Sequence, residues 1–401
     1  MPDFLPYGRQ SIDDDDIEAV VRVLRGDYLT TGPAVAAFES ALAAQTQAPH
    51  AVACANGTAA LHLATLALGL GEGDAAIVPT VTFLATANAV RYTGAEVIFA
   101  DVDPDSGLMT ASTLKEALSH AGGANVRAVL PVHLAGQSAE MTAIANVSEA
   151  EGLAVIEDAA HAIGASVNEN GKVIPVGACA HSTMTTFSFH PVKTITMGEG
   201  GVVTTRDPRL AERLTRLRSH GMTHSPGQLS ENDQAFDADG ARNPWYYEMS
   251  EPGFNYRLTD MQCALGLSQM AKLEDFVSRR RDLVAYYDER IAALAPLVRP
   301  LKRVADCAPA WHLYAVLIDF AATDIDRAQL MNALRDEGIG TQVHYIPVHR
   351  QPYYRRRYGA IDLPGADGYY ERTLSLPLFP EMSEADVDRV AGSLQRHLGV
   401  A

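Results

Sequence analysis

The sequence predicts an α/β protein built around a mostly parallel sheet, with a smaller α+β lobe at its C-terminal end. Between about residues 50 and 205, short runs rich in β-branched and apolar residues alternate with stretches of helical periodicity. Most of these runs are apolar throughout, which is typical of parallel strands that helices cover on both faces. A long helical pattern then leads towards residue 294 and into this lobe. We therefore expect a large domain over residues 1–290 and a small domain over residues 291–401.

The first helix and the central strands follow in chain order. An acidic run at residues 13–16 precedes an apolar-periodic stretch at 17–24, and carboxylates in a first turn stabilise a helix through its dipole. Helices are expected between the later strands, as at 59–68 and 139–151. Residues 221–245 are polar and contain glycine, so we interpret them as a mobile loop. The predicted strands are residues 50–54, 75–79, 96–101, 127–133, 153–158, 183–189 and 201–205.

The C-terminal part begins with one long predicted helix. Thr259 and Asp260 supply its N-cap, and the periodic pattern continues to about residue 294. Ser383, with Asp386 three residues later, resembles the capping box that opens a last helix. Between these helices we expect a strand, a helix closed by glycine and a second strand, at residues 311–319, 327–337 and 341–345.

Composition and charge exclude several classes of protein. The chain of 401 residues has a net charge of −17, which argues against nucleic acid and anionic membranes as partners. No apolar stretch reaches the length of a membrane span, and the first residues lack a basic-then-apolar signal, so we expect a cytoplasmic protein. We expect no metal site and reduced, structural cysteines, because the four are scattered singly. They are Cys54, Cys179, Cys263 and Cys307.

Lys193 and Asp158 are the candidate catalytic residues. Lys193 follows an apolar β-like run and precedes a glycine-rich turn, which predicts a desolvated amine that can attack a carbonyl. Asp158 ends an apolar strand, where a carboxylate can keep a cofactor ring nitrogen protonated, while its neighbour Glu157 alternates to the other face and serves structure. A buried lysine, a strand-end acid and a glycine turn together indicate pyridoxal phosphate.

A phosphate-binding turn is predicted at residues 56–59. Gly57, Thr58 and Ala59 open a helix, and a helix N-terminus offers unpaired N–H groups and a positive dipole end to an anion. A second candidate anion site is the basic cluster of Arg355, Arg356 and Arg357 with Arg350 and Arg372, which either binds a diphosphate or forms a solvated surface patch.

Motifs along nearly the whole chain resemble the DegT/DnrJ/EryC1/StrS family of sugar-nucleotide aminotransferases. The family has the type I pyridoxal-phosphate-dependent transferase fold, that of aspartate aminotransferase. Besides the segments around Asp158 and Lys193, the motifs are Tyr7-Gly8-Arg9, Leu29-Thr30-Thr31-Gly32-Pro33, Asn56-Gly57-Thr58-Ala59-Ala60-Leu61, Pro131-Val132-His133-Leu134-Ala135-Gly136, Gly253-Phe254-Asn255-Tyr256-Arg257-Leu258-Thr259-Asp260 and His344-Tyr345-Ile346-Pro347-Val348-His349.

The resemblance implies roles for individual residues. It makes Lys193 the lysine that binds the cofactor covalently, and it places His161 and Phe83 against the cofactor ring. Ser188 and, from a second subunit, Asn255 join the residues that bind the phosphate, so the resemblance implies a homodimer with shared active sites. The residues that it places near the substrate are His312, Tyr314, His344 and Tyr345.

The resemblance also implies a reaction. Residues 187–201, 218–221 and 245–247 are most similar to the transaminases of pseudaminic acid biosynthesis, which aminate C4 of a UDP-linked 4-keto-6-deoxy-N-acetyl sugar. L-glutamate is the donor usual in the family. The alternatives are a transaminase for a 4-keto pentose of lipid A modification or for a bacillosamine or perosamine precursor, a sugar dehydratase and a non-catalytic cofactor-binding regulator. Lys193 disfavours the dehydratase, which has histidine there, and the acidic balance disfavours a DNA-binding regulator.

Overall fold

A seven-stranded, mostly parallel sheet forms the centre of the computed structural model, in the part of the chain that it describes, residues 4–225, 227, 229–230 and 232–400. Neighbouring strands run parallel except at β9, which is antiparallel to both β1 and β8. The prediction of an α/β fold with a mostly parallel sheet is therefore confirmed. In spatial order the strands are β1 (His50–Cys54), β9 (Gly201–Thr205), β8 (Met184–Ser188), β5 (Ala154–Asp158), β4 (Asn125–Val129), β2 (Asp74–Pro79) and β3 (Glu96–Ala100).

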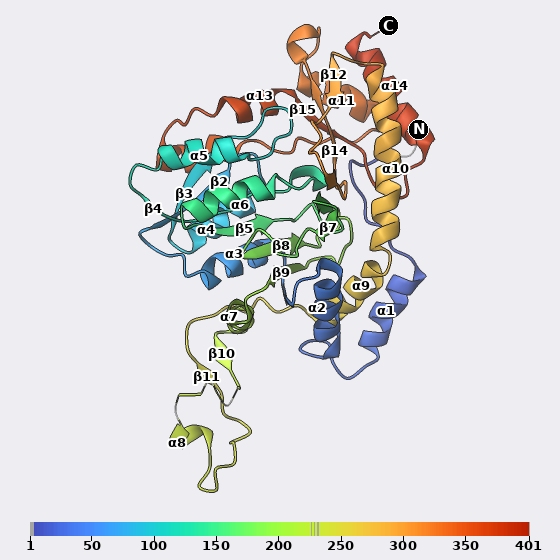
Figure 1. Cartoon of the computed structure of the whole chain (residues 1–401). Coiled ribbons are helices and arrows are strands. Elements are labelled where there is room, and N and C mark those ends of the chain that lie inside the picture. The colour runs from blue at the N-terminus through green and yellow to red at the C-terminus, as the bar shows by residue number, and fades with distance from the viewer. Residues whose placement is uncertain (1–3, 226, 228, 231, 401) are drawn as a thin grey trace.

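Helices cover both faces of this sheet (Figure 1). The apolar side chains of each strand alternate between the faces, as Val155 and Ile156 of β5 do, and each face has its own buried cluster. One face packs against α3 (Gly57–Ala67), α4 (Leu84–Tyr92) and α7 (Pro208–Arg218). The other packs against α2 (Pro33–Thr46), α5 (Ala111–Ser119) and α6 (Met141–Ala150). A sheet covered in this way exposes the ends of its strands, where ligands bind.

A second, antiparallel sheet lies in the C-terminal part of the chain. It consists of β12 (Val298–Pro300), β14 (Tyr314–Ile318) and β15 (Thr373–Leu376). Its buried cluster includes side chains of α10 (Leu273–Ala292), α11 (Arg327–Asp336) and α14 (Glu384–Leu398), together with Leu5 near the N-terminus. Because α10 spans residue 290 and contributes Leu283 and Tyr287 to this cluster, the predicted domain boundary falls within a packed helix and stays a prediction.

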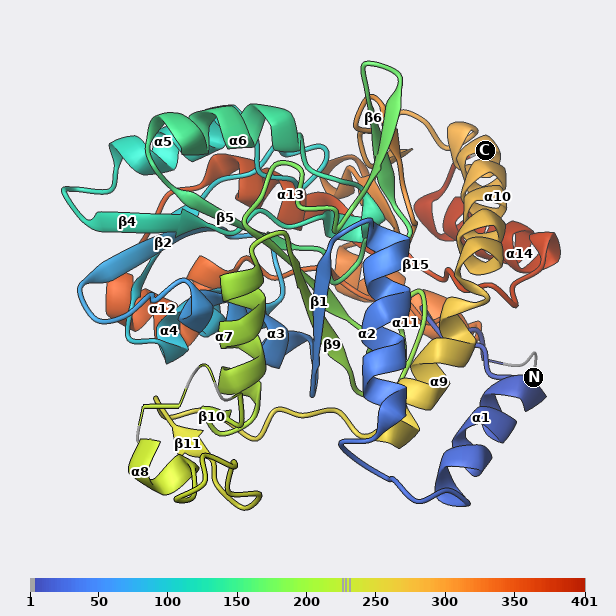
Figure 2. The same cartoon turned by 60° about the horizontal axis from the view of Figure 1, so that its bottom comes forward.

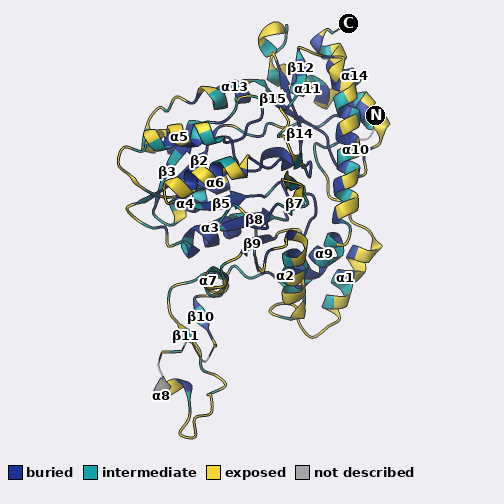
Figure 3. Cartoon of the chain, in the orientation of Figure 1, coloured by how far each residue is buried: buried dark blue, intermediate teal, exposed yellow. Residues whose placement is uncertain are grey.

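The remaining elements surround these two sheets. Residues 222–225, 227, 229–230 and 232–249 leave the body as an arm that the views from two directions show projecting away from it (Figure 2), and most of these residues are exposed (Figure 3). It contains β10 (Met222–Thr223), α8 (Asn232–Ala235) and β11 (Glu248–Met249). Outside the arm lie α1 (Asp14–Leu24), η1 (Leu134–Gly136), β6 (Ser166–Glu169), β7 (Lys172–Pro175), α9 (Asp260–Met270), β13 (Cys307–Ala308), η3 (Phe320–Ala322), η4 (Val348–Arg350), α12 (Pro352–Tyr358) and α13 (Pro364–Arg372).

Several sequence-based predictions need correction. The single helix expected from residue 260 to 294 is two helices, α9 and α10, although its predicted N-cap Thr259 is correct and forms a capping box with Gln262. The break falls at Lys272, whose amine pairs with Asp16 at the start of α1 (2.8 Å). Predicted strand 127–133 ends at residue 129, and the hairpin of β6 and β7 was not predicted.

The predicted strand at residues 341–345 is wrong. This segment has one isolated bridge, between Gln342 and Ser375, and otherwise follows an irregular path. The strand next to β14 is instead β15, which was not predicted. Local sequence gives a β-like pattern to both segments, and tertiary packing decides which of them joins the sheet.

Two predicted properties of the chain can be compared with the described residues. All four cysteines are free thiols, three of them buried and Cys307 partly exposed. None of the described helices has the length and apolar character that crossing a membrane requires.

Candidate active site

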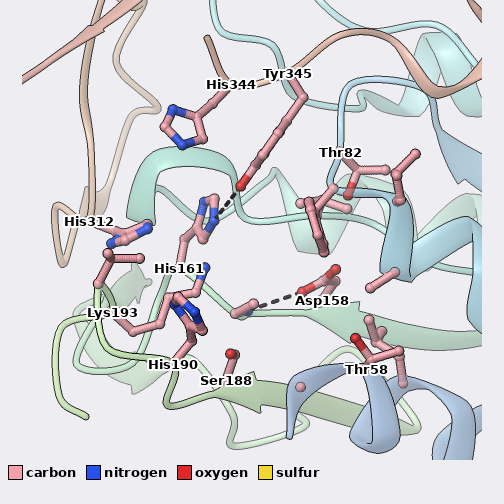
Figure 4. Close-up of a pocket in the computed structure, with 18 of the residues that line it drawn as sticks. Thr58, Thr82, Asp158, His161, Ser188, His190, Lys193, His312, His344 and Tyr345 are labelled. Carbon is pink, nitrogen blue, oxygen red and sulfur yellow. Dashed lines mark hydrogen bonds between the residues drawn. The ribbon is translucent and has the colours of Figure 1, made fainter. Parts of the chain in front are cut away.

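A cavity of about 590 Å³ opens where the carboxyl ends of β5 and β8 meet the first turn of α3 (Figure 4). The irregular segment 342–346 covers it from the C-terminal part of the chain. The cavity therefore lies at the position where open α/β sheets bind ligands. The predicted site residues that line it are Gly57, Thr58, Phe83, Asp158, His161, Ser188, Lys193, His312, His344 and Tyr345.

Lys193 lies in the turn after β8, and its side chain points into the cavity. The turn is closed by a hydrogen bond from the Lys193 N–H to the carbonyl of His190 (2.9 Å). Burial lowers the pKa of the Lys193 amine to about 8, and the carboxylate of Asp158 partly opposes this shift. Among the described residues the amine has no hydrogen-bond partner, so a neutral, unpaired nucleophile is available close to neutral pH.

Asp158 ends β5 and is buried. Each of its two carboxylate oxygens accepts a hydrogen bond from within the protein. Thr86 Oγ1 donates to Oδ2 at 2.7 Å, and the Ala160 N–H donates to Oδ1 at 3.1 Å. These bonds fix the orientation of a carboxylate that lines the cavity. Thr86 was not predicted as a site residue, and its place in the first turn of α4, three residues after Phe83, is the only signal that the sequence offers.

The first turn of α3 forms the predicted anion site, with one change. The side chain of the N-cap Asn56 already accepts the N–H of Ala59 at 2.9 Å, so that Ala59 has no free donor and does not line the cavity. The N–H groups of Gly57 and Thr58 have no acceptor within the described part of the chain. A side chain at position 57 would place its Cβ 2.7 Å from Cβ of Ser188, so this close approach requires glycine.

Three histidines and a tyrosine form the opposite wall of the cavity (Figure 4). The rings of His161 and His312 lie 4.4 Å apart, and Nδ1 of His344 is bonded to Ser375 Oγ at 2.8 Å. Burial, reinforced by Lys193, lowers the pKa of His344 to about 3 and holds the pKa values of His161 and His312 well below their usual range. The three rings are therefore neutral at physiological pH, and the wall offers polar contacts without adding positive charge.

Besides Ala59, two predicted residues lie outside the cavity, Tyr314 and Asn255. Tyr314 is a correction: its ring stacks on Tyr287 in the buried cluster of the second sheet, with centroids 4.4 Å apart, and its hydroxyl donates to the partly exposed Asp288 at 2.8 Å. His312 precedes β14 and reaches the cavity, whereas Tyr314 begins the strand and turns towards α10. Asn255 is exposed and pairs with the backbone of Ser219, so its predicted role depends on a second subunit and stays a prediction.

The basic cluster near residue 355 is largely neutralised by acids. Arg350 pairs with Asp367 (2.5 Å), Arg372 pairs with Asp105 (3.1 Å), and Arg357 pairs with Glu96. None of the five arginines lines the cavity. This arrangement favours the interpretation of the cluster as a surface patch.

Glu157 and His133 form a buried pair on the other face of β5. His133 Nε2 lies 2.7 Å from Glu157, and Nδ1 of the same ring accepts the N–H of Ala139 at 3.1 Å, which leaves the proton on Nε2. The hydroxyls of Ser182 and Thr185 donate to the second carboxylate oxygen, the latter at 2.9 Å. These donors lower the pKa of Glu157, which is therefore a buried anion satisfied within the protein, as expected of a structural residue.

Comparisons with known proteins agree with this geometry. The model of the DegT/DnrJ/EryC1/StrS aminotransferase family matches residues 10–395. The chain belongs to this family. The spore coat polysaccharide biosynthesis protein SpsC of Bacillus subtilis is 39% identical over 390 residues, which cover 96% of this chain and 95% of SpsC. The predicted family is therefore confirmed.

Solved structures of similar proteins cover almost the whole chain. Helicobacter pylori PseC, an aminotransferase involved in the biosynthesis of pseudoaminic acid, has a TM-score of 0.87 and 27% identity over 99% of this chain and 100% of its own. Spr1654 from Streptococcus pneumoniae, a sugar aminotransferase solved in forms with pyridoxal phosphate and pyridoxamine phosphate, has TM-scores of 0.85 and 0.86 at 26% identity, over 99% of this chain and 99% and 98% of its own. The chain is thus a sugar aminotransferase of the type I fold.

The residues of the cavity fit pyridoxal phosphate, on which aminotransferases of this family depend. The unpaired amine of Lys193 suits the aldehyde, and the oriented carboxylate of Asp158 suits a protonated ring nitrogen. The free N–H groups of Gly57 and Thr58, with Ser188 beside them, suit the phosphate.

Proposed function

We propose that the protein transfers the amino group of L-glutamate to C4 of a UDP-linked 4-keto-6-deoxy-N-acetylhexose, in the synthesis of a pseudaminic acid-type sugar. The observation that carries the transaminase chemistry is the convergence of the Lys193 amine, the Asp158 carboxylate and the α3 N-terminus on one cavity. The likeness to PseC and the similar sequence segments support the choice of sugar. The predicted cytoplasmic location belongs to the same proposal.

Individual residues of the chain have separate roles in this reaction. Pyridoxal phosphate, when bound, supplies a ring that stabilises negative charge on the donor's α-carbon. Lys193 would hold the aldehyde, and its neutral amine would take up the proton of that α-carbon. Asp158, held by Thr86, keeps the ring nitrogen protonated, and Phe83 and His161 border the ring. The N–H groups at Gly57 and Thr58 and the side chain of Ser188 hold the phosphate.

A second candidate substrate is the 4-keto sugar nucleotide of another surface polysaccharide. The 39% identity to SpsC, a spore coat polysaccharide biosynthesis protein, favours this class. A dehydratase is disfavoured because the cavity holds Lys193 where such an enzyme has histidine, and a DNA-binding regulator is disfavoured by the acidic balance of the chain.

The experiment incubates the purified protein with L-glutamate and a panel of 4-keto sugar nucleotides and detects amino sugars by mass spectrometry. We expect product from the UDP-linked 4-keto-6-deoxy-N-acetylhexose and none from the Lys193→Ala variant, which should still bind the cofactor. Product only from a 4-keto pentose or a different nucleotide would overturn the proposed sugar. Turnover by Lys193→Ala would overturn the role of Lys193.

We further propose that two copies of the chain share their active sites through Asn255. Mixing an inactive Lys193→Ala protein with an Asn255→Ala protein, under conditions that exchange subunits, creates dimers in which one site retains both residues. Activity above the sum of the two separate proteins is expected. If Asn255 acts within its own subunit, mixing adds no activity.

A further inference from the structure

The hydrogen bonds of His161 determine which of its ring nitrogens carries the proton. The N–H of Ala135 donates to Nδ1 at 3.3 Å, and a backbone N–H can only donate. Burial and the nearby Lys193 keep this ring neutral by holding its pKa well below the usual range. Its single proton is therefore on Nε2, the nitrogen that faces Tyr345.

The position of that proton sets the direction of the next hydrogen bond. His161 Nε2 and the Tyr345 hydroxyl lie 3.0 Å apart, so the N–H donates and the tyrosine oxygen accepts. The proton of the Tyr345 hydroxyl then needs another acceptor, and the described residues offer none. Burial raises the pKa of Tyr345 well above its usual value, so the hydroxyl keeps this proton.

The surrounding rings hold Tyr345 in this orientation. Its ring lies edge-on to His344 at 4.8 Å between centroids, and it packs beside His161 at 6.1 Å and Phe83 at 6.0 Å. The hydroxyl lies in the cavity into which Lys193 also points (Figure 4). The chain thus presents an oriented donor without a partner at the site of reaction.

We propose that the Tyr345 hydroxyl donates this hydrogen bond to the carbonyl oxygen of the keto substrate. The inference rests on the proposed function, in which every keto substrate brings a carbonyl oxygen to the amine-bearing site. The anionic acceptor nearby, Asp158, already accepts from Thr86 and from the Ala160 N–H, whereas a ketone oxygen arrives with free lone pairs. The hydrogen bond polarises the carbonyl, and it strengthens as negative charge develops on the oxygen during attack by an amine.

The test compares the two halves of the reaction in Tyr345→Phe, which removes only the hydroxyl. When L-glutamate is added, loss of the visible cofactor band requires a proton to leave the α-carbon of the donor. This step comes before any carbonyl oxygen forms. Recovery of the band from the amine-loaded protein begins with a carbonyl, supplied as 2-oxoglutarate or as the keto sugar. We expect the variant to lose its band within about threefold of the normal rate and to recover it about 10²–10³-fold more slowly with either keto substrate.

Three outcomes would overturn the proposal. Equal slowing of both halves would assign Tyr345 to positioning alone. A changed pH dependence of the bound cofactor's absorbance spectrum would mean that the hydroxyl bonds the cofactor ring instead. Recovery at the normal rate would leave the hydroxyl without a role. If the unmodified protein does not lose its band with glutamate, the proposed function itself is rejected. This result is obtained before any variant is made, so it cannot be confused with the outcomes above.

Three further variants serve as controls for the test. Tyr314→Phe removes a hydroxyl bonded to Asp288 outside the cavity and should leave both halves of the reaction unchanged. His161→Gln keeps the order of donors, because its amide oxygen can accept from Ala135 while its NH₂ donates to Tyr345, so we expect it to recover the band faster than His161→Leu does. His161→Leu removes both bonds and should slow recovery as Tyr345→Phe does.

Discussion

The two sides of the cavity are built in different ways. On the cofactor side, Asp158 and Ser188 lie at the ends of strands and Gly57 opens a helix, so regular elements fix their backbone. On the opposite wall, His344 and Tyr345 lie on an irregular segment that contacts between distant parts of the chain hold in place. The first arrangement suits the cofactor, which is the same whatever the substrate. The second suits the recognition of a particular substrate.

Asp158→Asn gives the largest effect expected on the cofactor side. The amide keeps the shape but loses the charge that holds a proton on the ring nitrogen, so kcat should fall on the order of 10²–10⁴-fold while Thr86 can still donate to the amide oxygen. Steady-state rates, divided by the cofactor content from absorbance, measure the loss. A variant with full cofactor and an unchanged kcat would remove Asp158 from the mechanism.

Gly57→Ala tests the phosphate site. The added Cβ would lie 2.7 Å from Cβ of Ser188, and relieving this overlap costs about 1–3 kcal/mol, so the Kd for pyridoxal phosphate should rise about tenfold or more. Titration of the apoprotein, followed by absorbance, gives the Kd. Gly71→Ala is the matched control, because a Cβ there meets nothing within 4 Å. Equal affinities of the two variants for pyridoxal phosphate would contradict the assignment of the phosphate site to the first turn of α3.

The pH dependence of cofactor uptake tests the environment of Lys193. Burial lowers its pKa to about 8, and the neutral amine is the form that reacts. About a tenth of the amine is neutral at pH 7 and about nine tenths at pH 9, so the uptake rate should rise nearly tenfold and then level off. Stopped-flow absorbance after mixing with excess cofactor measures the rate. A rise that continues past pH 10 would indicate a solvated lysine.

Glu157→Gln gives the smallest expected effect on catalysis, although Glu157 adjoins Asp158. Its amide no longer offers His133 a charged acceptor, so the free energy of unfolding should fall by about 1–3 kcal/mol, while kcat per bound cofactor stays within about threefold. Urea denaturation measures the first and rate assays the second. Glu169→Gln removes the same kind of pair with the partly exposed His181 and should cost less than about 1 kcal/mol. A large loss of kcat in Glu157→Gln would show that catalysis also depends on side chains on the other face of β5.

The sequence predicted the backbone of the cofactor side better than the backbone of the wall. Lys193, Asp158 and Gly57 follow from short motifs at the ends of regular elements, where one strand or one helix turn determines the position, and Ser188 follows from the family resemblance. Residues 341–345 have a β-like pattern, and only packing against the rest of the chain prevents them from forming a strand. Thr86 and the Ala135–His161 bond join segments far apart in sequence, which periodicity cannot reveal.

The most direct test of the central claim is the visible absorbance of the purified protein with pyridoxal phosphate, recorded before and after L-glutamate is added. We predict a yellow band that disappears with glutamate, and that the Lys193→Ala variant, with cofactor bound, fails to show this response. A band that glutamate leaves unchanged would contradict the proposed donor. The absence of any band in the unmodified protein would contradict the account of Lys193 and Asp158 as a cofactor site.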